Sequence, residues 1–163
     1  MYISSDSNIW FDFNSPDRFD HPFGLGYELY ISRAAFDEEL VEPTTLRTAL
    51  LEHGLQVADV QDDELATALL MQQKHKRLSV HDSIALAIAK HRGWVLLTGD
   101  KPLTNAAKEE KVECHGTIWV YDQLIAAGKI TPEEKRIAMD GLIELVLAGK
   151  RRLPLEELRK RRG

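Results

Sequence analysis

The segment from Leu78 to Leu103, LSVHDSIALAIAKHRGWVLLTGDKPL, constrains the fold more than any other part of the chain. Ser79 and Asp82 have the spacing of a capping box, with Asp in place of Glu, and predict that a helix begins there. The pair Arg92-Gly93 is typical of the end of that helix. The apolar run after it, Trp94 to Thr98, predicts a short buried strand. A helix that leads directly into a buried strand indicates an α/β fold.

The rest of the chain alternates strands and helices in the same way. We expect strands at residues 2–5, 27–32, 55–60 and 112–115, and helices at 33–42, 46–53, 63–76 and 102–111. Three further helices are expected at 117–130, 131–150 and 153–163, whereas the Pro- and Gly-containing segment 15–26 predicts a loop with one helical turn at most. This alternation predicts a single α/β domain whose parallel sheet has helices on both faces.

Length and composition fit one globular domain. The chain has 163 residues, of which 44% are hydrophobic and 29% are charged, enough to bury a sizeable core. Cys114 is the only cysteine, which excludes an intramolecular disulfide and a cysteine-based zinc site within one chain. The sequence contains no secretory signal and no apolar run of membrane-spanning length. We therefore expect a cytoplasmic protein without a membrane partner.

Charge is distributed unevenly along the chain. The formal net charge is −5, which gives no overall reason to expect binding to a polyanion. From Lys150 onward, seven basic residues stand against two glutamates, so this tail carries +5 and the preceding chain −10. Such a split is compatible with a functional basic tail and also with a solvated terminal helix.

Two acids directly follow expected strands, Asp6 after residues 2–5 and Asp100 after the Trp94 strand. In a parallel sheet the carboxyl ends of the strands lie at one edge, and binding sites form there around the switch point of the strand order. Asp6 and Asp100 are therefore expected to lie at the same edge of the sheet.

Further acids stand on helices next to these strands. Asp82 is in the first turn of the helix before the Trp94 strand, and Asp37, Glu38, Glu39 and Glu42 are on the helix expected after residues 27–32. Several carboxylates at one edge repel one another unless a cation lies between them. Mg²⁺ and Mn²⁺ prefer such oxygen ligands and could activate water for attack on a phosphodiester.

Each acid also has a purely structural interpretation. Asp6 could start a turn, Asp82 could act only as a capping residue, Asp100 could only open a helix, and the DEEL run could be a solvated helix face. Taken together, their order and context favour a shared site over unrelated roles.

Four segments resemble the signature segments of PIN-domain proteins: SSDSNIW, FDEELVEP, LSVHDSIALAIAK and VLLTGDKPLTNAAKEEKV. The resemblance covers roughly Tyr2 to Lys129, is strongest from Leu78 to Val112, and indicates the VapC-like ribonucleases, in a DUF3368-like branch. It implies an α/β domain with a parallel sheet of about five strands at residues 1–129. Residues 130–163 would then form a C-terminal helical extension.

The resemblance also implies a catalytic and metal-binding site made of Asp6, Glu39, Asp82 and Asp100. Thr98 corresponds to a hydroxyl residue that often supports the last acid, and Asn8 to a polar position near the first. Glu39 matches the family's glutamate better than Glu38, which would face about 100° away on a helix.

The activity implied by the resemblance is hydrolysis of RNA by a Mg²⁺- or Mn²⁺-dependent endoribonuclease, which could be the toxin of a toxin–antitoxin pair. The implied partners are RNA, an antitoxin protein and a second copy of the chain in a homodimer. Because an acidic site repels RNA, basic residues are needed at its rim. The candidates are Lys101, Lys108, Lys74, Lys76 and Arg77, along with the basic tail from Lys150.

Two other classes of protein remain open at this point. One is a PIN-like module that binds RNA or a protein without cutting RNA. The other is a phosphatase of the haloacid-dehalogenase type, but those enzymes usually begin with a DxD pair and Asp6-Ser7-Asn8 contains a single acid. The chain also lacks HExxH, Walker A and GxSxG motifs. The sequence therefore favours the nuclease.

Overall fold

Five short strands form the centre of the molecule. In the computed structural model, which describes residues 1–163, they are β1 (Tyr2–Ser5), β2 (Glu28–Ser32), β3 (Gln56–Ala58), β4 (Val95–Leu97) and β5 (Cys114–His115). Their order in the sheet is β3-β2-β1-β4-β5, and every neighbouring pair is parallel. The predicted parallel sheet of about five strands is therefore confirmed.

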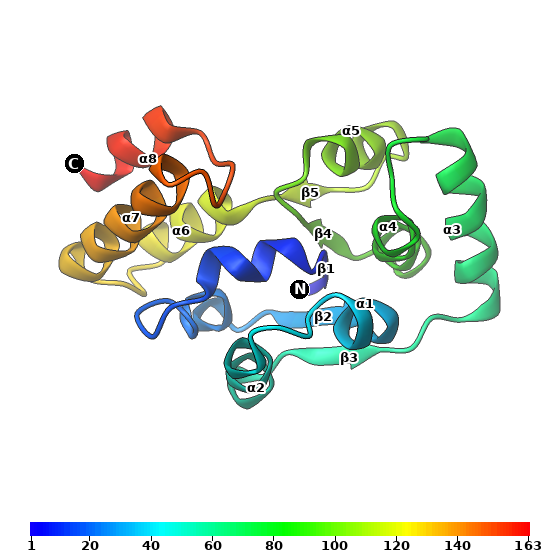
Figure 1. Ribbon diagram of the computed structural model, residues 1–163, viewed down its shortest axis with the longest axis horizontal. Helices are drawn as coiled ribbons and strands as arrows, with labels where there is room; N and C mark the ends of the chain where they lie inside the picture. The colour runs from blue at the N-terminus through cyan, green and yellow to red at the C-terminus, as the bar shows by residue number, and fades with distance from the viewer.

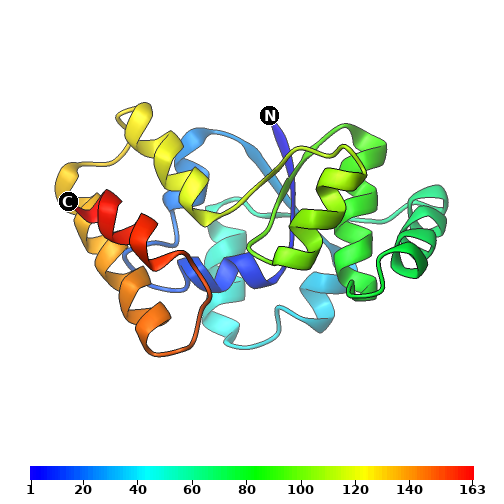
Figure 2. The ribbon, with the colours of Figure 1, turned by 90° about the horizontal axis from the view of Figure 1, so that it is seen from above.

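Helices surround this sheet (Figure 1). They are α1 (Arg33–Glu38), α2 (Thr44–His53), α3 (Asp62–Lys74), α4 (Val80–Arg92), α5 (Lys101–Glu109), α6 (Thr117–Ala126), α7 (Pro132–Leu147) and α8 (Leu155–Arg162), with 3-10 helices η1 (Asn8–Phe13) and η2 (His21–Leu25). In Figures 1 and 2, α3, α4 and α5 lie on one side of the central strands and α6, α7 and α8 on the other. None of the helices combines the length and the apolar character needed to cross a membrane.

The strands separate two hydrophobic cores, because alternate residues of a strand face opposite sides of the sheet. Ile3, Ile31 and Leu97 belong to the larger core, whereas Leu96 belongs to the smaller core beneath α3, α4 and α5. Burial on both faces explains why the central strands read as short apolar runs in the sequence.

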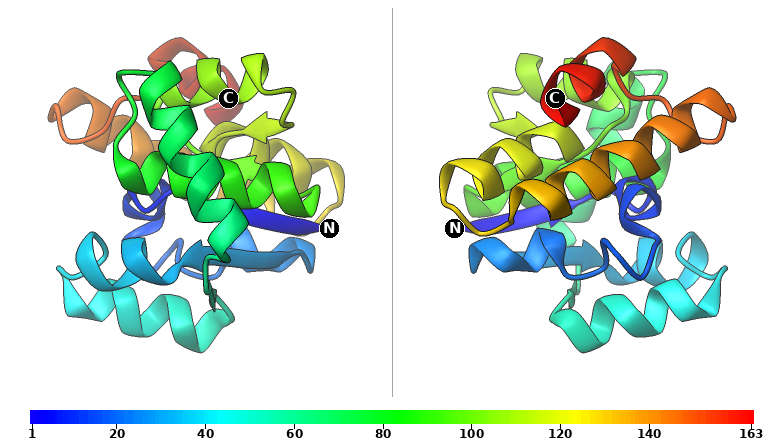
Figure 3. Two further views of the ribbon diagram at one scale, coloured as in Figure 1. Left: turned by 90° about the vertical axis from the view of Figure 1, so that its right-hand side faces the viewer. Right: turned by 90° about the vertical axis from the view of Figure 1, so that its left-hand side faces the viewer.

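The C-terminal helices are part of the larger core. Ala138, Met139 and Leu142 of α7 and Leu158 of α8 are fully buried in it. Figure 3 shows α6, α7 and α8 together at one end of the molecule, in front of the sheet when the molecule is viewed from that end. Residues 130–163 therefore pack on the sheet domain instead of projecting from it.

Most of the predicted helix ends are confirmed. Ser79 and Asp82 form the capping box of α4, and Gly93 ends that helix in the left-handed conformation with φ 67°. Thr131 and Glu134 form a second capping box at the start of α7.

One local prediction was wrong, and one element was not predicted. The helix expected at 33–42 ends at Glu38, because the N–H groups of Glu39 and Leu40 both bond to the carbonyl of Ala35 and the Leu40 side chain turns into the core. Glu39 therefore follows the helix instead of lying on it. Residues 8–13, to which the sequence pattern assigned no element, form η1, whose Trp10 and Phe13 are fully buried.

The substitution Leu158→Ala should lower the free energy of unfolding by about 2–4 kcal/mol, because it opens a cavity in the core shared by the sheet and the C-terminal helices. Lys160→Ala on the exposed side of α8 is the matched control and should change stability by no more than about 0.5 kcal/mol. Urea unfolding measures both. Equal stability of the two variants would show that α8 is not part of the cooperative core.

Candidate functional site

The strand order reverses between β1 and β4, which lie side by side at the centre of the sheet. From β1 the chain continues to β2 and β3 on one side, whereas β4 is followed by β5 on the other. Asp6 immediately follows β1, and its N–H donates to the carbonyl of Leu97 at the end of β4 over 3.0 Å. The sheet thus places Asp6 at the switch point, where α/β proteins form their sites.

Thr98 connects the two strand-end acids. Its hydroxyl donates to Oδ2 of Asp6 over 2.8 Å and accepts the N–H of Asp100 over 3.0 Å. Thr98 is itself buried. Thr98, the residue predicted to support the last acid, therefore uses its hydroxyl to hold the backbone of Asp100 and the side chain of Asp6.

The Asp6 carboxyl is buried, with 4% of the residue exposed. The pKa of Asp6 is raised to about 6. Burial is the largest cause, and repulsion from Asp82 and Glu39 adds to it, whereas the hydrogen bond from Thr98 lowers the pKa. These three acids are therefore close enough to interact electrostatically. Asn8 contributes its backbone N–H to Oδ1 of Asp6 over 3.3 Å, while its side chain is exposed.

Asp82 and Asp100 each cap a helix with one carboxylate oxygen. Oδ2 of Asp82 accepts the N–H of Ser79 over 2.9 Å, and Oδ2 of Asp100 accepts the N–H of Leu103 over 2.9 Å. The other oxygen of each carboxylate makes no hydrogen bond within the protein. The structural interpretation of these acids is correct, and it leaves one oxygen of each available for a ligand.

Glu39 is held by a residue that the sequence did not single out. The hydroxyl of Ser7 donates to Oε1 of Glu39 over 2.9 Å, and Ser7 is 1% exposed. The neighbouring Glu38 pairs instead with Nε2 of His81 over 2.8 Å. The only signal for Ser7 was its position between the two predicted site residues Asp6 and Asn8.

The donor chemistry of the site suits a hard divalent cation, because all four candidates are carboxylates. Glu39, Asp82 and Asp100 each retain an oxygen without a hydrogen-bond partner. No three His, Cys, Asp or Glu side chains of the chain are grouped closely enough to ligate one ion directly in their present positions. A cation would therefore be held partly through water, which is usual for Mg²⁺.

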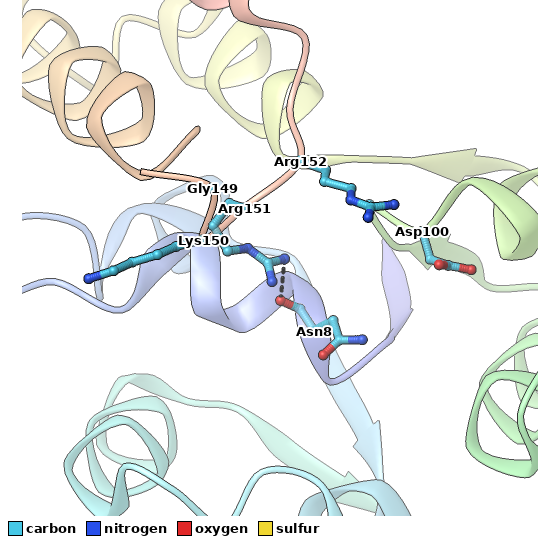
Figure 4. A pocket seen from close by; sticks show the side chains of 7 residues that line it. Asn8, Asp100, Gly149, Lys150, Arg151 and Arg152 are labelled. Carbon is cyan, nitrogen blue, oxygen red and sulfur yellow. Dashed lines mark hydrogen bonds between the residues drawn. The ribbon is translucent and has the colours of Figure 1, made fainter. Parts of the chain in front are cut away.

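Two adjoining cavities open beside Asp100. One of about 270 Å³ is lined by Asn8, Gly99, Asp100 and residues 149–152 (Figure 4). The other, of about 780 Å³, shares Gly99, Asp100, Gly149, Arg151 and Arg152 with it and is also lined by Arg77 and Lys101. Of the individual basic residues predicted at the rim, Arg77 and Lys101 therefore line the larger cavity, whereas Lys74, Lys76 and Lys108 line neither.

The cavities are also lined by Arg151 and Arg152, which belong to the basic tail that the sequence offered as a rim candidate without singling them out. They lie on the α7–α8 connector, residues 148–154. Nε of Arg151 pairs with Oδ1 of Asp12 over 2.5 Å, and its Nη2 donates to the carbonyl of Asn8 over 2.8 Å. Asp12 is 1% exposed and the Arg151 side chain is partly exposed, so this half-buried ion pair holds the connector against η1.

A parallel five-stranded sheet with acids gathered at its switch point defines a class of α/β proteins with an acidic site at the carboxyl edge. The DUF3368 family model, described as a PIN domain, matches residues 2–157. This chain therefore belongs to the PIN-domain family, and the resemblance seen in the sequence is confirmed.

Among solved structures, the chain is similar to a PilT N-terminus domain protein, SSO1118, from the hyperthermophilic archaeon Sulfolobus solfataricus P2. The TM-score is 0.50 at 16% sequence identity, and the match covers 77% of this chain and 92% of that one. At this identity the likeness concerns the fold alone. None of the curated proteins compared with the chain matches it.

The substitution Asp6→Asn should stabilise the fold near neutral pH by on the order of 2 kcal/mol. The pKa of Asp6 is raised from 3.8 to about 6 in the folded state, so between these values the folded protein binds more protons than the unfolded chain. The stability contributed by the protonated carboxyl is thus present below the ordinary pKa and lost as the pH rises through 6. Asparagine removes the buried charge and should therefore restore the stability that is lost above about pH 6.

Urea unfolding at about pH 7.5 and about pH 4 tests this expectation, because the gain should disappear at the lower pH. Asp17→Asn at an exposed position is the matched control and should leave stability unchanged at both pH values. An Asp6→Asn variant no more stable than the parent near neutral pH would contradict the assigned burial of this charge.

Proposed function

We propose that this PIN-domain protein is a metal-dependent endoribonuclease that hydrolyses RNA phosphodiester bonds at its four-carboxylate site. The observation that carries the proposal is Asp6, a buried carboxylate placed at the switch point within electrostatic reach of Asp82 and Glu39. Such a charge costs the fold stability, and costs of this kind concentrate at functional sites. Membership of the PIN-domain family supports nuclease chemistry.

The residues that would hold Mg²⁺ or Mn²⁺ are Asp6, Glu39, Asp82 and Asp100. When bound, the cation supplies charge neutralisation and Lewis acidity for phosphodiester hydrolysis. Thr98 keeps the Asp6 carboxylate in place, and Ser7 does the same for Glu39. With a pKa of about 6, Asp6 is mostly ionised at neutral pH and available as a ligand.

Basic residues at the rim would contact the RNA backbone. Lys101 and Arg77 line the cavity that contains Asp100, while Lys108 and Lys76 are exposed outside it. Phosphate contacts by such residues supply much of the affinity of nucleic-acid-binding proteins, independently of base sequence. Their role here is to offset the repulsion between the acidic site and RNA.

Purified protein should cleave single-stranded RNA only when Mg²⁺ or Mn²⁺ is added, and Asp6→Asn or Asp100→Asn should reduce the rate at least about a hundredfold. The measurement is gel analysis of a panel of labelled RNAs with and without EDTA. Asp17→Asn is the charge-matched control and should cleave like the parent. Cleavage that persists in EDTA, or is unchanged in both site variants, would refute the proposal.

Metal binding should depend on pH, because a proton and a cation compete for Asp6. At limiting Mn²⁺ the cleavage rate should fall as the pH is lowered through about 6, where this carboxyl becomes protonated. Mn²⁺ at about one hundred times its dissociation constant should stabilise the parent by about 2.7 kcal/mol and Asp6→Asn by much less. Thermal unfolding with and without the ion measures this difference independently of cleavage.

A non-catalytic PIN-like module that binds RNA or a protein is the second candidate. The observation in its favour is that no three acids are grouped for direct ligation of one ion. Tight RNA or protein binding without cleavage under any metal condition would establish this alternative. Release of phosphate from phosphomonoesters would instead indicate a phosphatase.

The proposal includes a toxin role within a toxin–antitoxin pair, with the chain acting as a homodimer in the cytoplasm. A small antitoxin gene should then lie next to the gene for this chain, and coexpression of its product should suppress RNA cleavage. Light scattering of the purified chain measures the oligomeric state.

A further inference from the structure

The larger cavity beside Asp100 is a basic groove of about 780 Å³. Four cationic side chains line it, together with the single acid Asp100: Arg77, Lys101, Arg151 and Arg152. They come from the turn before α4, the first residue of α5 and the α7–α8 connector. The groove therefore joins parts of the chain that are far apart in sequence, and it shares an acid with the candidate metal site.

Three of these cations have no partner within the protein. The side chains of Arg77, Lys101 and Arg152 take part in none of the ion pairs or hydrogen bonds that join other charged residues of the chain. Placing unpaired like charges around one groove brings no stability, because they repel one another. A polyanion bound in the groove would attract all of these cations and so offset their mutual repulsion.

The connector is built so that one arginine anchors it and the next enters the groove. Arg151 is fixed by buried Asp12 and by the carbonyl of Asn8. Arg152 then extends from the connector toward Asp100, whereas Lys150 points away from it (Figure 4). The ion pair of Arg151 thus determines where the guanidinium of Arg152 lies.

We infer that the α7–α8 connector is part of the substrate site and that Arg152 binds a backbone phosphate of single-stranded RNA in this groove. A guanidinium can hold phosphate oxygens in a bidentate manner. Arg77 and Lys101 contact the same strand by charge. Basic grooves that follow a backbone are typical of single-strand binding.

This inference deepens the proposed function, on which the identity of the ligand as RNA depends. It assigns Arg152 as a substrate-binding residue and Arg151 as a positioning residue. It also gives the α7–α8 connector, which lies within the family match at residues 2–157, a direct part in binding the substrate.

The test is fluorescence anisotropy of a labelled, mixed-sequence single-stranded RNA with Mg²⁺ present, in an Asp6→Asn background that prevents cleavage. Adding Arg152→Ala should weaken binding on the order of tenfold. It should also reduce the slope of log affinity against log salt by about 0.7, because one phosphate contact is lost. Arg152→Lys keeps the charge but not the bidentate geometry, so it should retain the slope and recover only part of the affinity.

Arg159→Ala is the matched control. It removes the same charge from the same C-terminal region, but Arg159 pairs with Glu156 on α8 and does not line the groove. The affinity of this variant for the RNA should differ from that of the Asp6→Asn background by less than about twofold. An Arg152→Ala variant that binds RNA as tightly as Arg159→Ala, or a background that binds no RNA at all, would overturn the inference.

Cleavage by the unmodified chain separates this inference from the proposed function. If the chain cuts no RNA but its RNA binding depends on Arg152, the nuclease proposal fails and the groove assignment stands. If the chain cuts RNA and Arg152→Ala binds and cuts as Arg159→Ala does, the groove assignment fails and the nuclease proposal stands.

Discussion

The site depends on the hydrogen bond from Thr98 to Asp6. This bond lies where β1 and β4 end side by side, and Thr98 also accepts the N–H of Asp100. One hydroxyl group therefore fixes two acids that are 94 residues apart in the chain. A buried carboxylate is costly unless it is hydrogen-bonded, so Asp6 can remain at the centre of the sheet only with such a partner.

The strand before Asp6 contains two serines, Ser4 and Ser5, and both of their buried hydroxyls are paired. The hydroxyl of Ser4 donates to the carbonyl of Ala85, and that of Ser5 donates to the carbonyl of Tyr30 and accepts Nε1–H of Trp10. Small side chains thus bring α4, β2 and η1 close to β1 without leaving a buried hydroxyl unsatisfied. The same packing excludes water from Asp6, which is why burial is the main cause of its raised pKa.

What the sequence could predict is the part of the structure governed by local rules. The capping box of Ser79 and Asp82, the terminal Gly93 and the acid after β4 all depend on residues close together in the chain, and the structure has each of these features as expected. Glu39 was placed on a helix because a periodic pattern does not show where the buried Leu40 draws the chain out of that helix. The pairing of Arg151 with Asp12 spans 139 residues and follows only from the packing of α7 and α8 against the sheet. No local pattern contains that information.

The asymmetry between an acidic body and a basic tail becomes intelligible once the chain is folded. The basic end of the chain does not form one patch: Arg161 and Arg162 pair with Asp122 and Asp140 on α6 and α7, and Arg151 pairs with Asp12. These three pairs attach the tail to the acidic body. Arg152 makes no such pair; it follows the anchored Arg151 and extends toward Asp100 (Figure 4). The tail is therefore both a structural clamp and the source of an unpaired cation next to Asp100, and neither role follows from its net charge alone.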